Sequence, residues 1–414
     1  MKKLIGNAVV GQSGGPTAAI NATLAGVIRG ALECDNINTL WGMRNGIEGL
    51  MEERFADLGE RFKSPENIED LALTPAAALG SCRRKLPAPD SADPAAIAVY
   101  ERIVEVMKKY DIRYFFYIGG NDSMDTVSKL SRYALLHPEY EFVAIGVPKT
   151  IDNDLSGTDH APGYGSAAKF IATVMQEIMH DCAVYTIPAV TIVEIMGRDA
   201  GWLTAAAGVG AAAGGYMPDG IYLPESVFSM DEFFDNVEKS FKKHPNLVIA
   251  VSEGIRFADG RYVGEGINSS SVDAFGHVRL SGAGKVLEAA VKERFGCKVR
   301  SVELNLPQRC AGHLLSATDI NEALAIGEVA VKCAAAGEGG KMMVFERLSN
   351  SPYKCEISSK NVFDIANAVS EVPEDFINEE KNGITDKCVE YILPLILGEI
   401  SPKYDKGVPQ YIKL

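Results

Sequence analysis

The chain has 414 residues, of which 47% are hydrophobic and 23% charged, and its formal net charge at pH 7 is −14. This length is enough for two domains with their own cores. The acidic charge argues against nucleic acid and anionic membranes as partners. The eight cysteines form no CxxC pair, which is typical of free thiols in a reducing cytosol. Because the sequence has neither a signal-peptide core nor a strongly apolar tract of membrane-spanning length, we expect a soluble, cytoplasmic protein.

The first predicted strand, residues 3–10, leads into the segment GQSGGPTAAINATLAGVIRGA. Gly14 and Gly15 fall in its turn, and apolar residues with helical spacing follow Pro16. A strand, a glycine turn and a helix can bind phosphate through backbone N–H groups. There is no Walker A sequence, which argues against a P-loop nucleotide hydrolase.

Two apolar runs farther along, residues 114–118 and 142–147, lack a helical period and are predicted to be buried parallel strands. The loop GGNDS follows the first, and PKTIDND follows the second. Ligands bind at the carboxyl ends of strands in an open α/β sheet. We therefore expect the two loops to face one site.

The first of these loops has the residues of a phosphate and metal site. Gly120 lets a phosphate approach the backbone, and a helix that starts at Asp122 or Ser123 would direct its N–H groups toward the phosphate. Asn121 and Asp122 offer oxygen ligands that suit Mg²⁺.

The second loop adds charge and a base. Lys149 supplies a positive charge for a phosphoryl group, and Thr150 supplies a hydroxyl. In an extended loop Asp152 and Asp154 would point the same way, opposite Asn153. One carboxylate could take a proton from an attacking hydroxyl while the other holds a metal. Each loop alone could be an ordinary turn, but together the loops predict phosphoryl transfer.

A dinucleotide site is a weaker interpretation. Residues 163–168 match the pattern G-x-G-x-x-A, but no predicted strand leads directly into them. The start of a helix over residues 164–180 explains the same glycines, so a nicotinamide-dependent dehydrogenase is disfavoured.

GGNDS and PKTIDND are similar to signature loops of the 6-phosphofructokinase family, specifically of its pyrophosphate-dependent branch. The resemblance covers about residues 5–330. It implies two similar three-layer α/β/α domains with mostly parallel sheets and an active site in the cleft between them. We expect a phosphoryl-donor domain over 1–147, completed by part of 310–414, and a sugar-phosphate domain over 148–309. The extension over 340–414 has no interpretable motif.

Further roles are implied by the resemblance alone. Gly14 and Gly15 would contact the donor, and Arg83, in a loop like the family's GS-x-R, would reach the transferring phosphate. The sugar phosphate would be bound by Met196, Gly197 and Arg198 of an MGR-x-AG loop, by Glu253, and by Arg300 and Arg309. Arg198 could instead pair with Asp199 or Glu194.

The chain departs from the family pattern at three places. Residues 305–307 lack the aromatic or imidazole side chain that contacts the sugar. Ala189 stands where ATP-dependent bacterial members have an arginine that a neighbouring subunit shares. Because two-domain members of the family associate, a homo-oligomer is expected, but without that arginine a dimer and a tetramer both stay open. Asn121 stands where the family has a metal-binding aspartate.

The donor is predicted from Asp122 and Lys149, which replace glycines of the ATP-dependent members. A carboxylate at Asp122 would repel the α-phosphate of ATP, and Lys149 would balance the charge of pyrophosphate. The resemblance thus implies Mg²⁺-dependent, reversible transfer from pyrophosphate to O1 of fructose 6-phosphate in glycolysis, with Asp152 as the base. An ATP-dependent 6-phosphofructokinase and a non-catalytic sugar-phosphate sensor are the alternatives.

Overall fold

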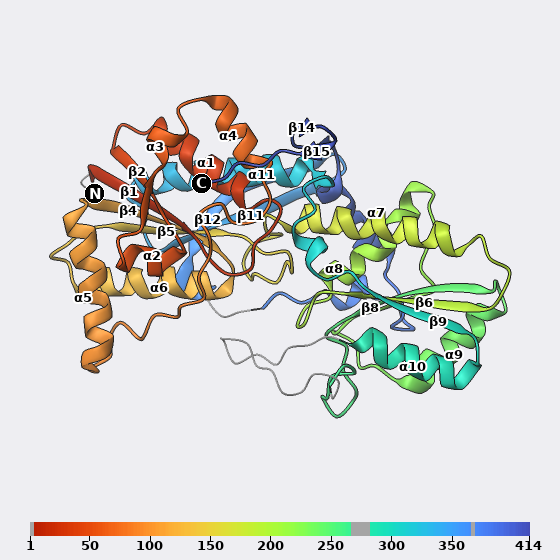
Figure 1. Cartoon of the computed structure of the whole chain (residues 1–414). Coiled ribbons are helices and arrows are strands. Elements are labelled where there is room, and N and C mark those ends of the chain that lie inside the picture. Colours follow the sequence, from red (N-terminus) through yellow and green to blue (C-terminus); the bar gives the residue numbers. More distant parts are fainter. Residues whose placement is uncertain (1–3, 266–281, 366–368) are drawn as a thin grey trace.

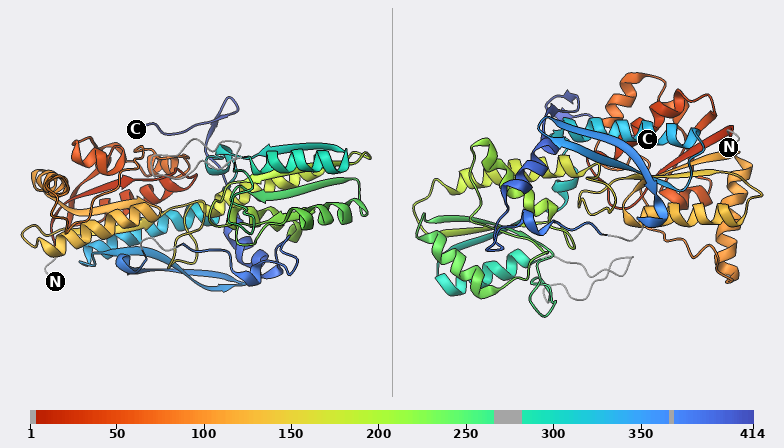
Figure 2. Two further views of the ribbon diagram at one scale, coloured as in Figure 1. Left: turned by 90° about the horizontal axis from the view of Figure 1, so that it is seen from below. Right: turned by 180° about the vertical axis from the view of Figure 1, so that it is seen from behind.

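The computed structural model describes residues 4–265, 282–365 and 369–414. Its helices and strands are grouped around two sheets (Figure 1). Seen from below, the two groups lie end to end and make the molecule elongated (Figure 2). Within the described ranges, no helix is both long and apolar enough to cross a membrane.

The first sheet has seven strands in the order β12-β11-β5-β4-β1-β2-β3. Its strands are β1 (Gly6–Gln12), β2 (Ile37–Met43), β3 (Phe55–Asp57), β4 (Ile112–Gly119), β5 (Val143–Pro148), β11 (Lys341–Asn350) and β12 (Tyr353–Asn361). From β11 to β2 the strands pair in parallel, and the edge strands β3 and β12 are antiparallel to their neighbours. Because β4 and β5 are buried on both faces, they are nearly continuous apolar runs, as the sequence indicated.

Helices cover both faces of this sheet. One face packs against α1 (Ile20–Leu32), α3 (Leu58–Arg61), α4 (Pro65–Ala72) and α11 (Ala317–Ala335), and the other against α2 (Gly46–Met51), α5 (Pro94–Lys109) and α6 (Asn121–Leu136). The backbones of α1 and α11 approach closely, since a Cβ on Gly26 would lie 2.0 Å from the carbonyl oxygen of Leu324. Glycine is therefore required at this crossing. The helix expected directly after Pro16 begins only at Ile20, so the glycine turn is longer than predicted.

The second sheet has the order β7-β8-β6-β9 and is parallel throughout. Its strands are β6 (Ala189–Ile195), β7 (Gly220–Tyr222), β8 (Asn246–Ser252) and β9 (Lys298–Glu303). One face packs against α7 (Tyr164–Cys182), α8 (Trp202–Ala205), η1 (Ala206–Ala213), α12 (Asp386–Ile392) and η5 (Leu393–Ile396), and the other against α9 (Met230–Phe241) and α10 (Ala283–Phe295). The architecture is thus two three-layer α/β/α units, as expected.

The remaining elements are short. They are η2 (Leu306–Arg309), β10 (Leu315–Ser316), η3 (Val362–Asp364), η4 (Glu374–Phe376), β13 (Glu399–Ile400), β14 (Tyr404–Asp405) and β15 (Val408–Pro409).

The C-terminal segment contributes to both units. The hairpin β11-β12 extends the first sheet next to β5, while α12 and η5 supply Cys388, Ile392 and Leu395 to a core of the second. The chain then returns to the first unit, where the backbone N–H of Ile412 donates to Thr74 Oγ1 at 3.1 Å. The predicted domain boundaries stay predictions, but residues 340–414 are integrated into both units.

Candidate active site

The loops predicted to carry the chemistry start at the same edge of the first sheet. Gln12 at the end of β1 pairs with Ile118 of β4, and Gly119 pairs with Pro148 at the end of β5. In the second sheet Ile195 pairs with Ser252, so the loops after β6 and β8 also begin together. Parallel strands in register therefore place each set of loops side by side.

Lys149 lies at the meeting point of these loops. Its side chain donates from Nζ to the carbonyl oxygen of Gly15 at 2.6 Å, and the residue is 3% exposed. Burial lowers the pKa of Lys149 to about 8, against the opposing effect of the Asp152 and Asp154 carboxylates. The positive charge of Arg309 lowers the pKa of this amine further. The structure therefore brings together a cation from the first unit's sheet and a guanidinium from η2 of the second.

Asp152 and Asp154 flank a turn in the backbone. Asn153 between them has a positive φ of 55° and points its side chain inward, where Nδ2 donates to the Tyr391 hydroxyl at 2.9 Å. The backbone N–H of Asp152 donates to Thr150 Oγ1 at 3.1 Å. The loop is therefore not extended at Asn153, as the sequence argument assumed, because this residue adopts the left-handed conformation between the two aspartates.

Asp152 has the electrostatic surroundings of a general base. Burial raises the pKa of Asp152, the nearby Asp154 and Glu253 carboxylates raise it further, and Lys149 and Arg198 oppose them. A carboxylate whose pKa is raised toward neutrality takes a proton more readily than a solvated one. Glu253 and Arg198 follow strands of the second sheet, and their charges shift the pKa of Asp152. The carboxyl edge of the second sheet therefore faces the loop that carries Asp152.

Asn121 and Asp154 have oxygen atoms suited to a divalent cation. Asn121 Nδ2 approaches Asp154 Oδ2 at 3.5 Å, so the two side chains are adjacent. Asn121 Oδ1 is buried, and nothing in the described chain hydrogen-bonds to it. A buried oxygen without a donor needs another partner. The Asn121 amide oxygen and the Asp154 carboxylate are therefore ligand types that fit a hard divalent cation.

Hydrogen bonds join the glycine turn after β1 to the segment over residues 81–83, two loops that are predicted to bind the donor. Gly14, whose φ is 77°, donates from its N–H to the carbonyl oxygen of Cys82 at 3.3 Å, and its own carbonyl accepts from Ser81 Oγ at 2.6 Å. These bonds fix the segment that carries Arg83 against the glycine turn. The predicted phosphate contact of the Gly14 N–H would thus have to share that group with Cys82.

The side chain of Ser123, a predicted donor contact, forms a hydrogen bond within the site. The residue is 1% exposed, and its hydroxyl donates to Ser13 Oγ at 3.0 Å. A Cβ on Gly119 would lie 1.9 Å from this hydroxyl oxygen, so the glycine makes room for it. The Ser123 side chain therefore joins the start of α6 to the loop after β1. Gly120 precedes the first residue of α6, as a phosphate-binding turn requires.

Sequence reasoning missed a buried polar network beneath the donor loops. Gln12 donates from Nε2 to Asn21 Oδ1 at 2.8 Å and accepts from the Leu79 N–H at 2.9 Å. Asn21 donates in turn to the carbonyl oxygen of Thr74 at 2.8 Å. Both side chains are fully buried, so the network fixes the path of the chain toward Arg83. The sequence signal for this network was the presence of Gln12 and Asn21 next to apolar strand and helix positions.

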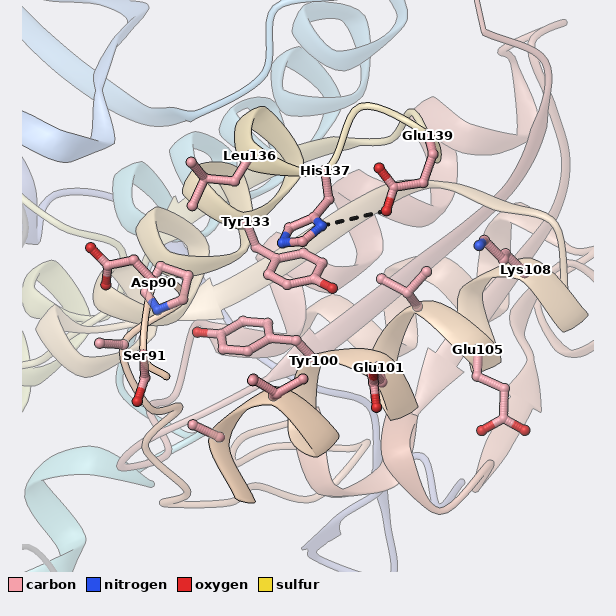
Figure 3. Close-up of a pocket in the computed structure, with 15 residues that line it drawn as sticks. Asp90, Ser91, Tyr100, Glu101, Glu105, Lys108, Tyr133, Leu136, His137 and Glu139 are labelled. Carbon is pink, nitrogen blue, oxygen red and sulfur yellow. Dashed lines mark ion pairs between the residues drawn. The ribbon is translucent and has the colours of Figure 1, made fainter. Parts of the chain in front are cut away.

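Asp122 forms an ion pair with the basic segment over residues 83–85. Its Oδ1 lies 3.1 Å from Lys85 Nζ, and both side chains are about half exposed. The segment continues past α6 and α5, where the Tyr100 hydroxyl donates to the carbonyl oxygen of Pro87 at 2.6 Å. Beyond it lies a groove between α5 and α6 that is lined by the stacked rings of Tyr100, Tyr133 and His137 (Figure 3). This groove contains none of the predicted site residues.

The predicted sugar-binding loop after β6 is held by Glu253. The N–H of Gly197, whose φ is 134°, donates to Glu253 Oε1 at 3.2 Å, and the N–H of Met196 donates to the buried side chain of Gln308 at 3.1 Å. Burial raises the pKa of Glu253 to about 7. Gln308 was not singled out from the sequence, although it precedes Arg309.

Arg198 does not form the ion pairs considered as alternatives. Asp199 pairs with Arg256 at 2.7 Å, and Glu194 accepts hydrogen bonds from the backbone N–H groups of Gly282 and Gly284. Arg198 Nε is buried, and no described group hydrogen-bonds to it. The guanidinium thus has hydrogen-bonding capacity for an anionic ligand.

Arg300 and Arg309 are not brought together within one chain. Arg309 Nη1 would lie 3.4 Å from a Cβ on Gly15, beside the donor loop. Arg300 lies on β9 and lines a separate pocket with Ala189 and Asn246, near the starts of the neighbouring strands β6 and β8. The two arginines therefore lie apart within one chain, and their predicted role in binding the sugar phosphate stays a prediction.

The two mostly parallel sheets, whose carboxyl-end loops meet around Lys149 and Asp152, have the arrangement of a phosphofructokinase. The chain belongs to the phosphofructokinase family, whose model, described as Phosphofructokinase, matches residues 7–333.

Named relatives and solved structures agree. The chain is 41% identical to the pyrophosphate--fructose 6-phosphate 1-phosphotransferase of Methylococcus capsulatus, over 99% of this chain and 96% of that protein. It is 32% identical to the sulfofructose kinase of Alkalicoccus urumqiensis, over 90% and 92%. The crystal structure of the pyrophosphate-dependent phosphofructokinase of Nitrosospira multiformis superposes with a TM-score of 0.88 at 38% identity, over 99% of this chain and 96% of that one.

Proposed function

We propose that this protein transfers a phosphoryl group from pyrophosphate to O1 of fructose 6-phosphate, giving fructose 1,6-bisphosphate and phosphate, as a reversible step of glycolysis. The observation that carries the proposal is the buried Lys149 amine, bonded to Gly15 and influenced by Asp152 and Asp154. It provides a positive charge where a donor phosphate and an acceptor hydroxyl would meet. The names of the relatives support the same donor and acceptor.

In the proposed mechanism Asp152 accepts the proton of the O1 hydroxyl as O1 attacks the phosphorus atom. The new bond joins O1 to phosphorus, the bridging P–O bond of pyrophosphate breaks, and phosphate leaves with that bond's electron pair. Lys149 and Arg83 stabilise the charge that develops on the phosphoryl oxygens. Thr150 orients the Asp152 backbone through its hydroxyl. Mg²⁺ held by Asn121 and Asp154 would supply further positive charge to the phosphates.

The preference for pyrophosphate is assigned to Asp122 and Lys149. Asp122 places a carboxylate at the first turn of α6, where a longer donor would bring its third phosphate. Repulsion between the two anions would disfavour ATP. The Lys85 partner reduces this charge but leaves the carboxylate in place. ATP is therefore the alternative donor that the assay must include.

The sugar phosphate is assigned to the second unit. Glu253, Met196 and Gly197 form one hydrogen-bonded loop, and Arg198 and Arg309 supply positive charge. Arg300 would serve such a site only in an assembly, because it lies apart from Arg309 in the single chain. We accordingly propose a homo-oligomer, dimer or tetramer, located in the cytoplasm.

The test is formation of fructose 1,6-bisphosphate from fructose 6-phosphate and Mg²⁺ with either pyrophosphate or ATP. Turnover with pyrophosphate alone would support the reaction and the donor assignment. Turnover with ATP alone would retain Asp152 as the base but overturn the roles of Asp122 and Lys149. Absence of turnover with both donors, together with binding of fructose 6-phosphate, would favour a sugar-phosphate sensor.

A further inference from the structure

The loop that carries Asp152 and Asp154 is closed on itself and attached to the C-terminal segment. Its ends meet where the Thr150 N–H donates to the carbonyl oxygen of Pro162 at 3.2 Å. Within it, the Asn153 side chain accepts from the Ala161 N–H at 3.0 Å and donates to the Tyr391 hydroxyl at 2.9 Å. That hydroxyl donates onward to the carbonyl oxygen of Asp159 at 2.7 Å. Tyr391 of α12 therefore joins the two sides of the loop.

A buried histidine lies next to this junction. His160 is 3% exposed, and its ring stacks on Phe345 with centroids 4.4 Å apart and planes within 3°. Nδ1 lies 2.8 Å from Asp159 Oδ1, and Nε2 lies 2.8 Å from Glu322 Oε2. A neutral imidazole has only one N–H, whereas the imidazolium has two. Two carboxylates facing the two ring nitrogens are thus both satisfied only by the protonated ring.

The charges around the ring balance only in that state. Arg347 lies 2.9 Å from the same Asp159 oxygen and donates to the carbonyl oxygen of Tyr391 at 2.8 Å. Two carboxylates, Asp159 and Glu322, thus meet two cations, His160 and Arg347. Burial alone would lower the pKa of His160, but the hydrogen bonds to the two carboxylates outweigh it and raise the pKa to about 9.

The other polar groups of the cluster come from β12. The Tyr353 hydroxyl donates to Glu322 Oε1 at 2.7 Å, and burial raises the pKa of the Cys355 thiol to about 12. Both groups are therefore neutral at physiological pH. His160, Glu322 and Cys355 are close enough to suggest a metal site. The protonated ring and the protonated thiol argue against that interpretation.

We propose that His160, held as an imidazolium between Asp159 and Glu322, is a positioning residue that fixes the Asp152–Asp154 turn through Tyr391 and Asn153. The inference rests on the proposed function of that turn in phosphoryl transfer. Its physical basis is that Asp159 is bonded to the ring through its side chain and to Tyr391 through its backbone. A change in the hydrogen bonds of His160 would therefore alter the position of Asn153 through Asp159 and Tyr391. The two carboxylates on either side of Asn153 would move with it.

Tyr391→Phe tests the link with the least disturbance, because it removes only the hydroxyl. We expect kcat to fall by about 10- to 100-fold with little change in KM for fructose 6-phosphate, the range for small misplacement of catalytic groups. Tyr140→Phe is the matched control, since the Tyr140 hydroxyl also makes two buried hydrogen bonds, to Met107 and Ile112. A purely stabilising role would lower Tm in both variants and leave kcat of the folded enzyme unchanged, which would overturn the proposal.

Charge pairing is tested at His160 itself. His160→Gln leaves Asp159 and Glu322 with one cation, and kcat should fall by about tenfold or more. Adding Glu322→Gln restores the balance of charge and should recover part of this loss. His137→Gln, at an exposed histidine, is the control. Equal kcat in His160→Gln and the wild type, or no recovery in the double variant, would contradict the assigned role.

A third measurement separates this inference from the proposed function. Rates of hydrogen exchange over residues 150–161 should rise in Tyr391→Phe and stay unchanged in Tyr140→Phe, whichever donor the enzyme uses. If the wild type turns over ATP instead of pyrophosphate, the kcat ratios are measured with ATP. Unchanged exchange in Tyr391→Phe would overturn the positioning role even if the pyrophosphate reaction is confirmed.

Discussion

The Nζ atom of Lys149 donates a 2.6 Å hydrogen bond to the carbonyl oxygen of Gly15, so the loop after β5 is joined to the loop after β1 by the amine that we assign to the donor phosphate. The contact explains how a lysine with only 3% exposure stays in a fixed position. Burial, which lowers the pKa of this amine to about 8, makes its charge sensitive to pH within the physiological range.

Lys149 predicts a decline of activity at alkaline pH. Its pKa is lowered to about 8, so the amine is charged below that pH and becomes neutral above it. We expect kcat/KM for pyrophosphate to fall as pH rises through about 8. Lys149→Arg should be slower at pH 7 but should keep its activity to higher pH, because a guanidinium does not titrate there. An unchanged alkaline midpoint in this variant would assign the decline to another group.

Asp152→Ser should remove the base. We expect kcat to fall by about 10²- to 10⁴-fold, the usual contribution of general base catalysis, with a much smaller change in binding of fructose 6-phosphate. Asp111→Asn, a change at an exposed aspartate, is the control for charge alone. An effect confined to KM would mean that Asp152 binds substrate and does not take the proton.

The donor assignment predicts a gain of function. Asp122→Gly combined with Lys149→Gly should weaken turnover with pyrophosphate and allow some turnover with ATP, because the repelling carboxylate and the balancing amine are both removed. Steady-state rates with each donor measure the change. Intact turnover with pyrophosphate in the double variant would show that the two residues do not select the donor.

The Lys85–Asp122 ion pair should affect the donor more than the fold. Because both side chains are about half exposed, Lys85→Ala should change the free energy of unfolding by less than about 1 kcal/mol. KM for pyrophosphate should rise, since Asp122 would keep its full negative charge near the donor. Lys63→Ala, in another exposed pair, should leave both quantities unchanged. A large loss of Tm in Lys85→Ala would indicate a structural role instead.

Asn121→Ala tests the metal ligand. Loss of the buried Oδ1 atom should raise the Mg²⁺ concentration for half-maximal activity by about tenfold or more, an effect typical of altered metal sites. Removal of Mg²⁺ by a chelator should abolish turnover, and added Mg²⁺ should restore it. Asn67→Ala, at an exposed position on α4, serves as the control. The same Mg²⁺ dependence in both variants would exclude Asn121 as a ligand.

The sequence predicted most of what depends on local patterns. The apolar run over residues 114–118 lies within β4, and the run over 142–147 differs from β5 by one residue at each end. Gly15 and Lys149 lie side by side because parallel strands place their carboxyl ends at one edge. These inferences needed only hydrophobic periodicity and the position of polar residues after strands.

What could not be predicted depends on contacts between distant segments. Tyr391 meets Asn153 across 238 positions in the sequence, and no local pattern marks either residue as a partner. Arg300 and Arg309 are close in sequence, but Arg300 lies near the start of β9, whereas Arg309 lies in η2 beyond the end of that strand and next to Gly15. The hairpin β11-β12 was missed because an extension without a motif gives no indication of the sheet that it joins.

The place of β11 in the first sheet has a consequence for biosynthesis. β5, which ends at the residue before Lys149, pairs with β4 on one side and, through Ile145 and Gly146, with β11 on the other. While the chain is being translated, β5 remains an open edge until residues 341–342 have left the ribosome, and such edges invite pairing with other chains. A nascent chain that stalls before this point would have the loops of the proposed donor site but an unfinished sheet beneath them, and its open edge at β5 would be a place where a chaperone could bind.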